Sequence, residues 1–169
     1  MSERRAKRLF SAMVQLSPHI WIRVAAALFG ALTVGHLSAY PWTSTRITDE
    51  VQLVSSMKMV EFVFAGERQT YWGLYFGWGL LVALLLLSTA VTLWLVSDLV
   101  GVAPRRVGLI TGVILATSLL GCLISVRFFY VPPAVFYAAV SVVLAAPTVQ
   151  LIRYNRKTRI SGRSAIDDC

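Results

Sequence analysis

Residues 66–95 read GERQTYWGLYFGWGLLVALLLLSTAVTLWL, and this stretch decides the fold. Its head is charged and rich in aromatic side chains, whereas the run from Trp72 to Val96 contains no charged residue. A helix needs about 20 predominantly apolar residues to cross a hydrocarbon core roughly 30 Å thick. The run exceeds that length, so the sequence predicts a membrane-spanning helix here.

The composition of the whole chain agrees with a membrane protein. Of its 169 residues, 57% are hydrophobic and 14% are charged, whereas about a quarter of a soluble domain is charged. The net charge of +8 comes from basic residues at both ends and in one short loop, beside apolar runs. That placement is typical of residues that orient membrane proteins, so we predict a lipid bilayer as partner and no nucleic acid.

We expect four spans in all, at about residues 20–40, 72–96, 107–126 and 134–152. A basic N-terminal segment, 1–19, precedes them, and a basic tail, 153–169, follows them. The tail is polar, and we expect it to be disordered. The predicted fold is therefore all-α, a four-helix transmembrane bundle with one long loop over residues 41–71.

That long loop carries a helical pattern of its own. Thr48 is placed to cap a helix, and Asp49 and Glu50 would occupy its first turn. Apolar residues then recur on one face, at Leu53, Met57, Val60 and Phe64. We predict an amphipathic helix over about residues 48–65, lying at the membrane surface and ended by Gly66.

The distribution of lysine and arginine predicts the orientation. Twelve basic residues lie on one side of the predicted spans: Arg4, Arg5, Lys7, Arg8, Arg23, Arg105, Arg106, Arg153, Arg156, Lys157, Arg159 and Arg163. Four lie on the other: Arg46, Lys58, Arg68 and Arg127. The richer side should be cytoplasmic, which places both termini inside and the long loop outside.

Small residues that repeat at about one helical turn predict where the spans pack, because lipid gives apolar helices little drive to associate. The four sets are Ala27, Ala31 and Gly35; Gly73 and Gly77; Gly108, Gly112 and Ala116; and Ala134, Ala138, Ser141 and Ala145.

Polar and aromatic side chains near the outer ends of the spans form the candidate site. An ionisable group within a membrane is a functional candidate, and His36 is the best one here. We predict an outward-opening recess in which ligand-binding residues are His36, Tyr71, Tyr75, Trp78 and Arg127. Glu67 and Arg68 would act as a gate at its mouth. The alternative interpretation is structural for each: His36 bonded to a tyrosine, Arg127 anchored at the interface, and Glu67 with Arg68 as a solvated pair.

The pattern of residues favours binding over catalysis. No nucleophile lies beside a base, no glycine-rich phosphate loop is present, and no metal-ligand spacing occurs. We predict no catalytic residue, no metal site and no resident cofactor, and we name a quinone or a lipid as the candidate ligand. Two alternatives stay open: an accessory or structural subunit, as a homo-oligomer or within a membrane complex, and a quinone-linked oxidoreductase component.

The head of the second span also carries a resemblance. The pattern Gly66-x-Arg68-x-Thr70-Tyr71-Trp72-x-x-Tyr75-x-Gly77-x-Gly79 resembles a signature of small, uncharacterised bacterial four-span membrane proteins, which are similar in size and layout to the DoxX-like proteins. Two further matches are Gly35-His36 and Phe128-Phe129 before Pro132. The family often has an acid where this chain has Gly73. The resemblance implies a four-helix bundle in a bacterial cell (inner) membrane, and it implies no particular activity.

Overall fold

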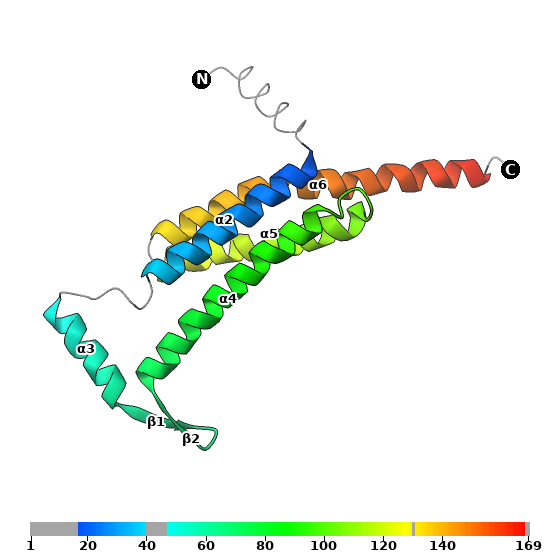
Figure 1. Ribbon diagram of the computed structural model, residues 1–169. Helices are drawn as coiled ribbons and strands as arrows, with labels where there is room; N and C mark the ends of the chain where they lie inside the picture. Colours follow the sequence, from blue (N-terminus) through cyan, green and yellow to red (C-terminus); the bar gives the residue numbers. More distant parts are fainter. Residues whose placement is uncertain (1–16, 40–46, 130, 168–169) are drawn as a thin grey trace, which may run out of the picture. The chain divides into compact units, whose positions relative to one another are not determined.

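The structure is a computed structural model that describes residues 17–39, 47–129 and 131–167, with side chains described as far as residue 153 (Figure 1). The predicted basic segment before residue 17 lies outside the described residues, and so does the start of the long loop, 40–46. The element order is α2, α3, β1, β2, α4, α5 and α6.

Four of these helices are long and apolar enough to cross a membrane. They are α2 (Pro18–Ala39), α4 (Tyr71–Ser97), α5 (Pro104–Phe128) and the Val131–Arg153 part of α6 (Val131–Asp167). Each begins and ends within about three residues of its predicted span. The all-α class and the four-helix transmembrane bundle are thereby confirmed, and the chain is an integral membrane protein.

The long loop differs from its prediction. Helix α3 spans Thr48–Met59 and ends before the expected residue 65. A β-hairpin follows it, in which β1 (Glu61–Phe64) pairs antiparallel with β2 (Glu67–Thr70). The helix over 48–65 was therefore wrong in its last turn and a half. The reason lies in the two residues between the strands, because Ala65 and Gly66 both have positive φ angles, 53° and 88°. This is the backbone of a tight two-residue hairpin turn.

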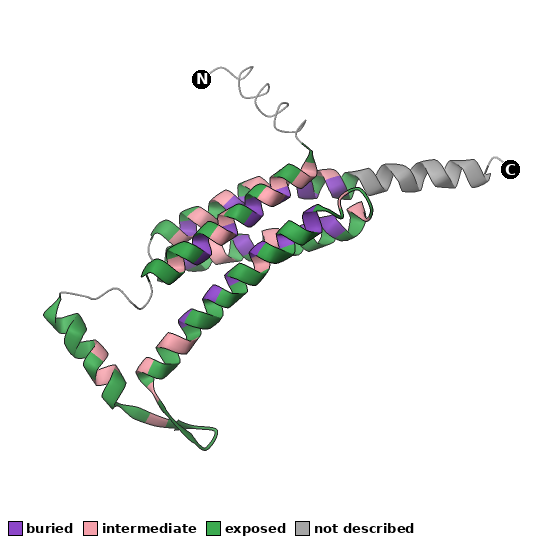
Figure 2. Ribbon diagram, viewed as in Figure 1, coloured by how far each residue is buried: buried purple, intermediate pink, exposed green. Residues whose placement is uncertain are grey.

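The beginning of α3 also differs in detail. Thr48 is the first helical residue rather than the cap, and Ile47 occupies the capping position with no side-chain bond. The predicted acids, Asp49 and Glu50, do lie in the first turn. No described residue of α3 is buried, and Figure 2 accordingly draws this helix in green and pink without purple.

Helix α6 continues through the tail that was expected to be disordered, as far as Asp167. Pro147 lies within it and does not end it. Extending an existing helix adds one hydrogen bond per residue without a new nucleation step. The tail prediction was therefore wrong about secondary structure, because the tail follows directly from a long helix.

Contacts divide the chain into two units, Met1–Phe29 with Thr89–Cys169, and Gly30–Ser88. In the first unit α5 and α6 pack closely as antiparallel neighbours. A Cβ atom at Gly108 would lie 3.1 Å from the Leu151 Cβ, and one at Gly121 would lie 3.1 Å from the ring of Tyr137. Between them, Thr148 donates to the Thr111 hydroxyl at 3.0 Å. Glycine therefore sets the distance between these two helices.

The predicted small-residue seams are confirmed in part. Gly108 is buried and Gly112 half-buried against α6, and Ala134 and Ser141 are buried on α6 itself. The set on the first span was wrong: Ala27, Ala31 and Gly35 are exposed. The buried face of α2 mixes small and large residues instead, at Ile22, Ala26, Phe29 and Thr33. Their spacing of four, three and four is that of a helix-packing stripe.

Candidate functional site

The predicted site residues lie mostly in the second unit, which comprises the end of α2, the loop elements and the first two-thirds of α4. Thr70 caps α4: its Oγ1 accepts from the Gly73 backbone N–H at 3.0 Å, which is the N-cap to N3 bond that favours threonine before a helix. The hairpin is joined to the helix at the same point, because the Tyr71 N–H donates to the Val60 carbonyl at 3.4 Å. The head of α4 is thus held by its own loop.

His36 contacts α4 one turn below Tyr75. Its Nε2 lies 3.0 Å from the carbonyl oxygen of Gly79, which is buried. A carbonyl can only accept, so Nε2 donates in this contact. Because Gly79 follows Tyr75 by four residues, both lie on one face of the helix. The structure therefore brings His36 to the face of α4 that carries Tyr75.

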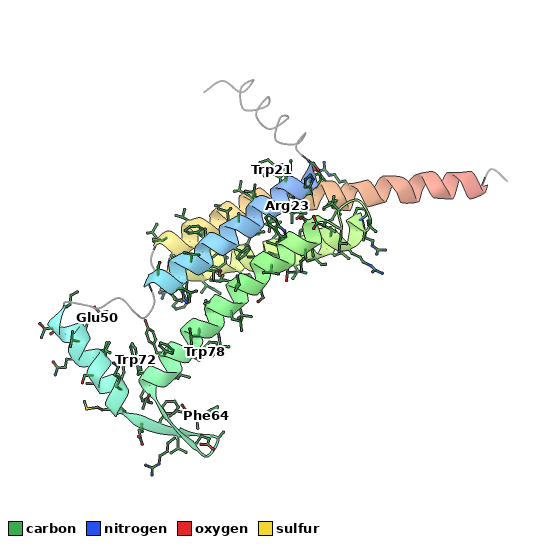
Figure 3. All side chains as sticks on the ribbon, in the orientation of Figure 1. Trp21, Arg23, Glu50, Phe64, Trp72 and Trp78 are labelled. Carbon is green, nitrogen blue, oxygen red and sulfur yellow. The ribbon has the colours of Figure 1, made fainter. Side chains whose placement is uncertain are left out.

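Trp78 lies to one side of the His36 contact. It precedes Gly79 by one residue, which turns it by about 100° around the helix axis. Its side chain is 61% exposed, and Figure 3 labels it on α4. Tyr71, Tyr75 and Trp78 lie within about 60° of one another around the helix, which is the single face that the sequence predicted. His36 contacts α4 at the edge of that face next to Tyr75, and Trp78 lies towards its other edge.

Aromatic rings cluster around the first turn of α4. The ring centroids of Trp72 lie 5.9 Å from Tyr75 and 6.5 Å from Phe76. Lys58 of α3 places its ammonium group 5.0 Å from the Trp72 ring, a cation–π contact. Tyr71 belongs to this cluster through the hairpin, since its ring lies 4.9 Å from that of Phe62. The cluster fastens α3 and the hairpin to the start of α4.

Glu67 and Arg68, the predicted gate residues, are both exposed, as the alternative of a solvated pair expects. Both lie in β2, where successive side chains point to opposite faces of the strand. Arg68 instead reaches Glu61 of β1, with Nη1 3.6 Å from Oε2. These two residues are diagonal neighbours across the hairpin, since Arg68 pairs in register with Val63. The pair braces the hairpin at its exposed surface.

Arg127 belongs to the first unit, in the last turn of α5. It is exposed, and its guanidinium carbon lies 5.2 Å from the centroid of the Phe128 ring. A cation beside an aromatic ring at the end of an apolar helix is the arrangement expected of an interfacial anchor.

A shallow groove lies on α4 beside Trp78. Its volume is about 240 Å³, and it is lined by Gln69, Gly73, Leu74, Gly77, Trp78 and Leu81. A Cβ atom at Gly77 would meet nothing within 4 Å, so this glycine leaves a notch in the helix surface, whereas a Cβ atom at Gly73 would lie 3.2 Å from the Thr70 Oγ1. Gly77 precedes Gly79 by two residues, about 200° around the helix, and so the groove faces away from the His36 contact. We call it the α4 groove.

The sequence indicated this groove only through its glycines. Gly73 and Gly77 were predicted to form a packing seam, whereas among the described residues they line an open groove. Gln69, Leu74 and Leu81 were not predicted. Their positions follow from the hairpin, which brings Gln69 next to the first turn of α4, and the hairpin itself was missed.

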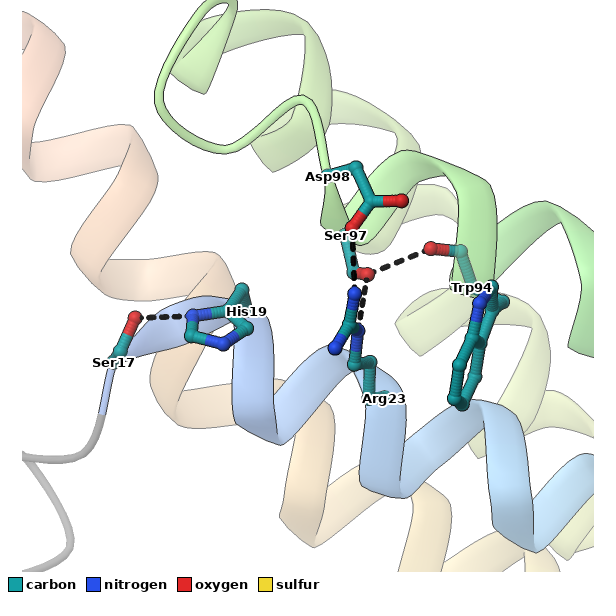
Figure 4. A network of polar contacts seen from close by, with 6 residues as sticks. All are labelled: Ser17, His19, Arg23, Trp94, Ser97 and Asp98. Atoms are coloured by element: carbon teal, nitrogen blue, oxygen red, sulfur yellow. Dashed lines mark hydrogen bonds and ion pairs between the residues drawn. The ribbon is translucent and has the colours of Figure 1, made fainter.

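A cluster of polar contacts lies in the first unit, around Arg23 of α2 (Figure 4). Arg23 Nη2 donates to Oδ1 of Asp98 at 2.7 Å, and its Nε donates to the Ser97 hydroxyl at 3.1 Å. Ser97 is buried and donates in turn to the Trp94 carbonyl at 2.6 Å. The guanidinium carbon lies 5.0 Å from the Trp94 ring. The contacts of Arg23 with Asp98, Ser97 and Trp94 connect α2 to the end of α4.

Comparison with known proteins adds no relative: no family model matches the chain, and no curated protein and no solved structure matches it either. The similarity to small four-span bacterial proteins stays a prediction from the signature residues of α4.

Proposed function

We propose that the protein is a non-enzymatic protein of a bacterial inner membrane, with both termini cytoplasmic, that binds an uncharged amphipathic molecule in the α4 groove. The observation that carries this proposal is the glycine notch beside an exposed indole. Gly77 opens the helix surface, and Gly73 and Trp78 line the opening.

The lining supports an uncharged ligand. Among the six lining residues only Gln69 and Trp78 have side chains that can form hydrogen bonds; the amide of Gln69 both donates and accepts, and the indole N–H of Trp78 donates. Leu74, Leu81 and the indole offer apolar surface to a chain or a ring. A quinone fits this chemistry, since its carbonyl oxygens accept from an amide and its ring and isoprenoid tail are apolar.

The place of the groove on the helix supports access from the lipid. Trp78 and Leu81 are exposed and belong to an apolar span, so a molecule dissolved in the bilayer reaches them directly. Under the predicted orientation the groove lies at the outer side, where Trp and Tyr residues are common. Pockets of a few hundred cubic ångströms with few polar groups are typical small-molecule sites.

The test is native mass spectrometry of the purified protein with a short-chain quinone. Wild type should retain the quinone, and Gly77→Leu should lose it, because the new side chain fills open space in the notch. Gly35→Leu is the matched control, since a Cβ there also meets nothing within 4 Å and Gly35 does not line the groove. Equal quinone occupancy in Gly77→Leu and wild type would remove the proposal.

A second candidate function, an accessory subunit, is favoured by the same glycines. A Gly-x-x-x-Gly face lets a second membrane helix approach closely. In that case Gly77→Leu would lower the mass of the oligomer measured in detergent, and it would do so in samples to which no quinone has been added. A wild-type protein that is strictly monomeric in mild detergent and in lipid nanodiscs would count against the subunit role. Electron transfer through a bound quinone is a further hypothesis, and reduction of added quinone by the purified protein would support it.

A further inference from the structure

A second pocket lies in the first unit, far along the chain from the α4 groove. Its volume is about 350 Å³, and its lining residues are Pro18, Val100, Gly101, Pro104, Gln150 and Leu151. They come from the start of α2, the turn between α4 and α5, the start of α5, and α6. We call it the turn pocket.

The turn pocket lies at the level of the membrane boundary. Pro18 begins one apolar helix and Pro104 begins another, and the apolar part of α6 ends at Arg153, two residues beyond Leu151. Lipid head groups lie where such helices leave the hydrocarbon. A pocket at this level is therefore exposed to head groups rather than to acyl chains or to bulk water alone.

Basic residues flank the pocket in the sequence. Arg105 and Arg106 directly follow Pro104, and Arg153 lies one helical turn after Gln150; all three are exposed. Within the described part of the chain, the two ion pairs are Arg23–Asp98 and Arg68–Glu61, so neither occupies these guanidinium groups. Asp98, the acid two residues before Val100, is already neutralised by Arg23. The surroundings of the pocket are therefore positively charged.

We infer that the turn pocket binds the head group of an anionic phospholipid, with Arg105, Arg106 and Arg153 around the phosphate. Arginine suits this role because its planar group forms paired hydrogen bonds with phosphate oxygens. Basic pockets between membrane helices are established sites for anionic head groups. The proposal concerns a different unit and a different ligand charge from the α4 groove, and it does not depend on the proposed function.

The apolar lining distinguishes a phospholipid from free phosphate. Five of the six lining residues have no polar side chain, so a bare phosphate ion would be held by the arginines and would gain little from the pocket lining. A phospholipid brings a glycerol backbone and acyl chains next to its phosphate. Exposed apolar side chains beside the pocket can receive those chains, at Leu99, Val102 and Ile152.

The experiment is lipid titration of the full-length, delipidated protein, followed by native mass spectrometry. The probes are phosphatidylglycerol, phosphatidylcholine and inorganic phosphate. We expect phosphatidylglycerol to bind at least tenfold more tightly than phosphatidylcholine, and inorganic phosphate at millimolar concentration not to displace it. The double variant Arg105→Gln/Arg106→Gln should weaken phosphatidylglycerol binding by about thirtyfold, because each basic side chain near a lipid surface is worth about a factor of five.

One variant distinguishes binding of the lipid in the pocket from a general attraction of anionic lipid to the positive charge. Gly101 lines the pocket and a Cβ there meets nothing within 4 Å, so Gly101→Leu fills the pocket without removing a charge. It should weaken phosphatidylglycerol binding by roughly tenfold, whereas Gly77→Leu, which fills the α4 groove, should leave it unchanged. The arginine double variant provides an independent result if Gly101→Leu does not fold.

Two outcomes would overturn the inference. One is phosphatidylglycerol binding to a folded Gly101→Leu protein at wild-type strength, which would mean that charge alone attracts the lipid. The other is equal binding of phosphatidylglycerol and phosphatidylcholine to wild type. Neither result depends on quinone retention, so the two proposals fail or succeed separately.

Discussion

Arg23 of α2 donates to the carboxylate of Asp98, just beyond the end of α4, with Nη2 2.7 Å from Oδ1. Their side chains are 40% and 58% exposed. A pair this exposed is worth at most about 1 kcal/mol, and the contact with Trp94 adds roughly another 0.5–1 kcal/mol. The same guanidinium group also bonds Ser97, which is buried, so its removal leaves that hydroxyl without its side-chain donor.

We therefore expect Arg23→Gln to lower the melting temperature by a few degrees, since about 1 kcal/mol corresponds to roughly 2–4 °C in a chain of this size. The measurement is thermal unfolding in detergent, followed by circular dichroism. Arg105→Gln is the control, because its exposed side chain belongs to neither described ion pair. A melting temperature equal to that of the control would show that the cluster contributes nothing to stability.

The glycines between α5 and α6 predict two opposite responses to alanine. At Gly108 the new Cβ would lie 3.1 Å from the Leu151 Cβ, an atom fixed to its own backbone, so Gly108→Ala should destabilise by about 1–3 kcal/mol. At Gly112 the nearest atom would be the Thr148 Cγ2 at 3.6 Å, an ordinary contact, and Gly112→Ala should be neutral or stabilising by up to about 1 kcal/mol. Unfolding in SDS measures both, and the reverse order would contradict the packing.

Because the buried hydroxyls of Thr111 and Thr148 are bonded to each other, we expect the effects of replacing them on stability to be coupled. Thr148 donates to Thr111 at 3.0 Å, and Thr111 donates to the Val107 carbonyl at 3.0 Å. Each single change to valine should cost about 0.6–1.7 kcal/mol, the range for hydrogen bonds between membrane helices. The double variant should cost less than the sum, because both partners then lack the polar group. A double-mutant cycle in SDS measures the coupling, and strict additivity would exclude it.

The hairpin turn predicts changes of opposite sign at adjacent positions. Gly66 has φ of 88°, which a β-branched residue adopts at a cost of about 1–2 kcal/mol or more, so Gly66→Val should loosen the hairpin. Ala65 has φ of 53°, and Ala65→Gly should relieve strain by a similar amount. Limited proteolysis of the loop reports both changes: cleavage should be faster in the first variant and slower or unchanged in the second.

We expect replacement of His36 to lower stability without changing quinone binding. His36→Leu removes the bond to the Gly79 carbonyl and should cost about 0.6–1.7 kcal/mol. Because the α4 groove lies on the opposite side of the helix, quinone retention should match wild type. Loss of quinone from a folded His36→Leu protein would instead restore the single recess that the sequence predicted.

The spans could be predicted from the sequence because the length of an apolar run alone identifies a membrane-spanning helix. An uninterrupted apolar run such as the one after Trp72 has no other stable arrangement, since a bilayer requires every backbone group to be bonded within the segment. The hairpin could not be predicted by the same reasoning. The apolar residues Val60 and Phe64 fit a helical face, and the positive φ angles at Ala65 and Gly66 decide between helix and turn.

The sequence could predict that the candidate site lies at the head of α4, but it could not predict which part of that helix His36 contacts. The head of α4 does hold the aromatic cluster and the groove, but rotation around the helix separates Trp78 from the His36 contact. Residues at i, i+4 and i+7 share one face of a helix, but the spacing does not say how that face is turned towards α2, and the contact of His36 with the Gly79 carbonyl supplies this. Arg23 was assigned to orientation alone, because a sequence gives no distance between residues 23 and 98.

Helix α4 has 27 residues, which makes it about 40 Å long, against roughly 30 Å for the hydrocarbon core. The excess must tilt the helix, thicken the lipid around it, or leave its first turns among the head groups. The α4 groove lies in those first turns. The thickness of the surrounding bilayer therefore sets whether the notch at Gly77 meets acyl chains or water, and with it the surroundings of the proposed site.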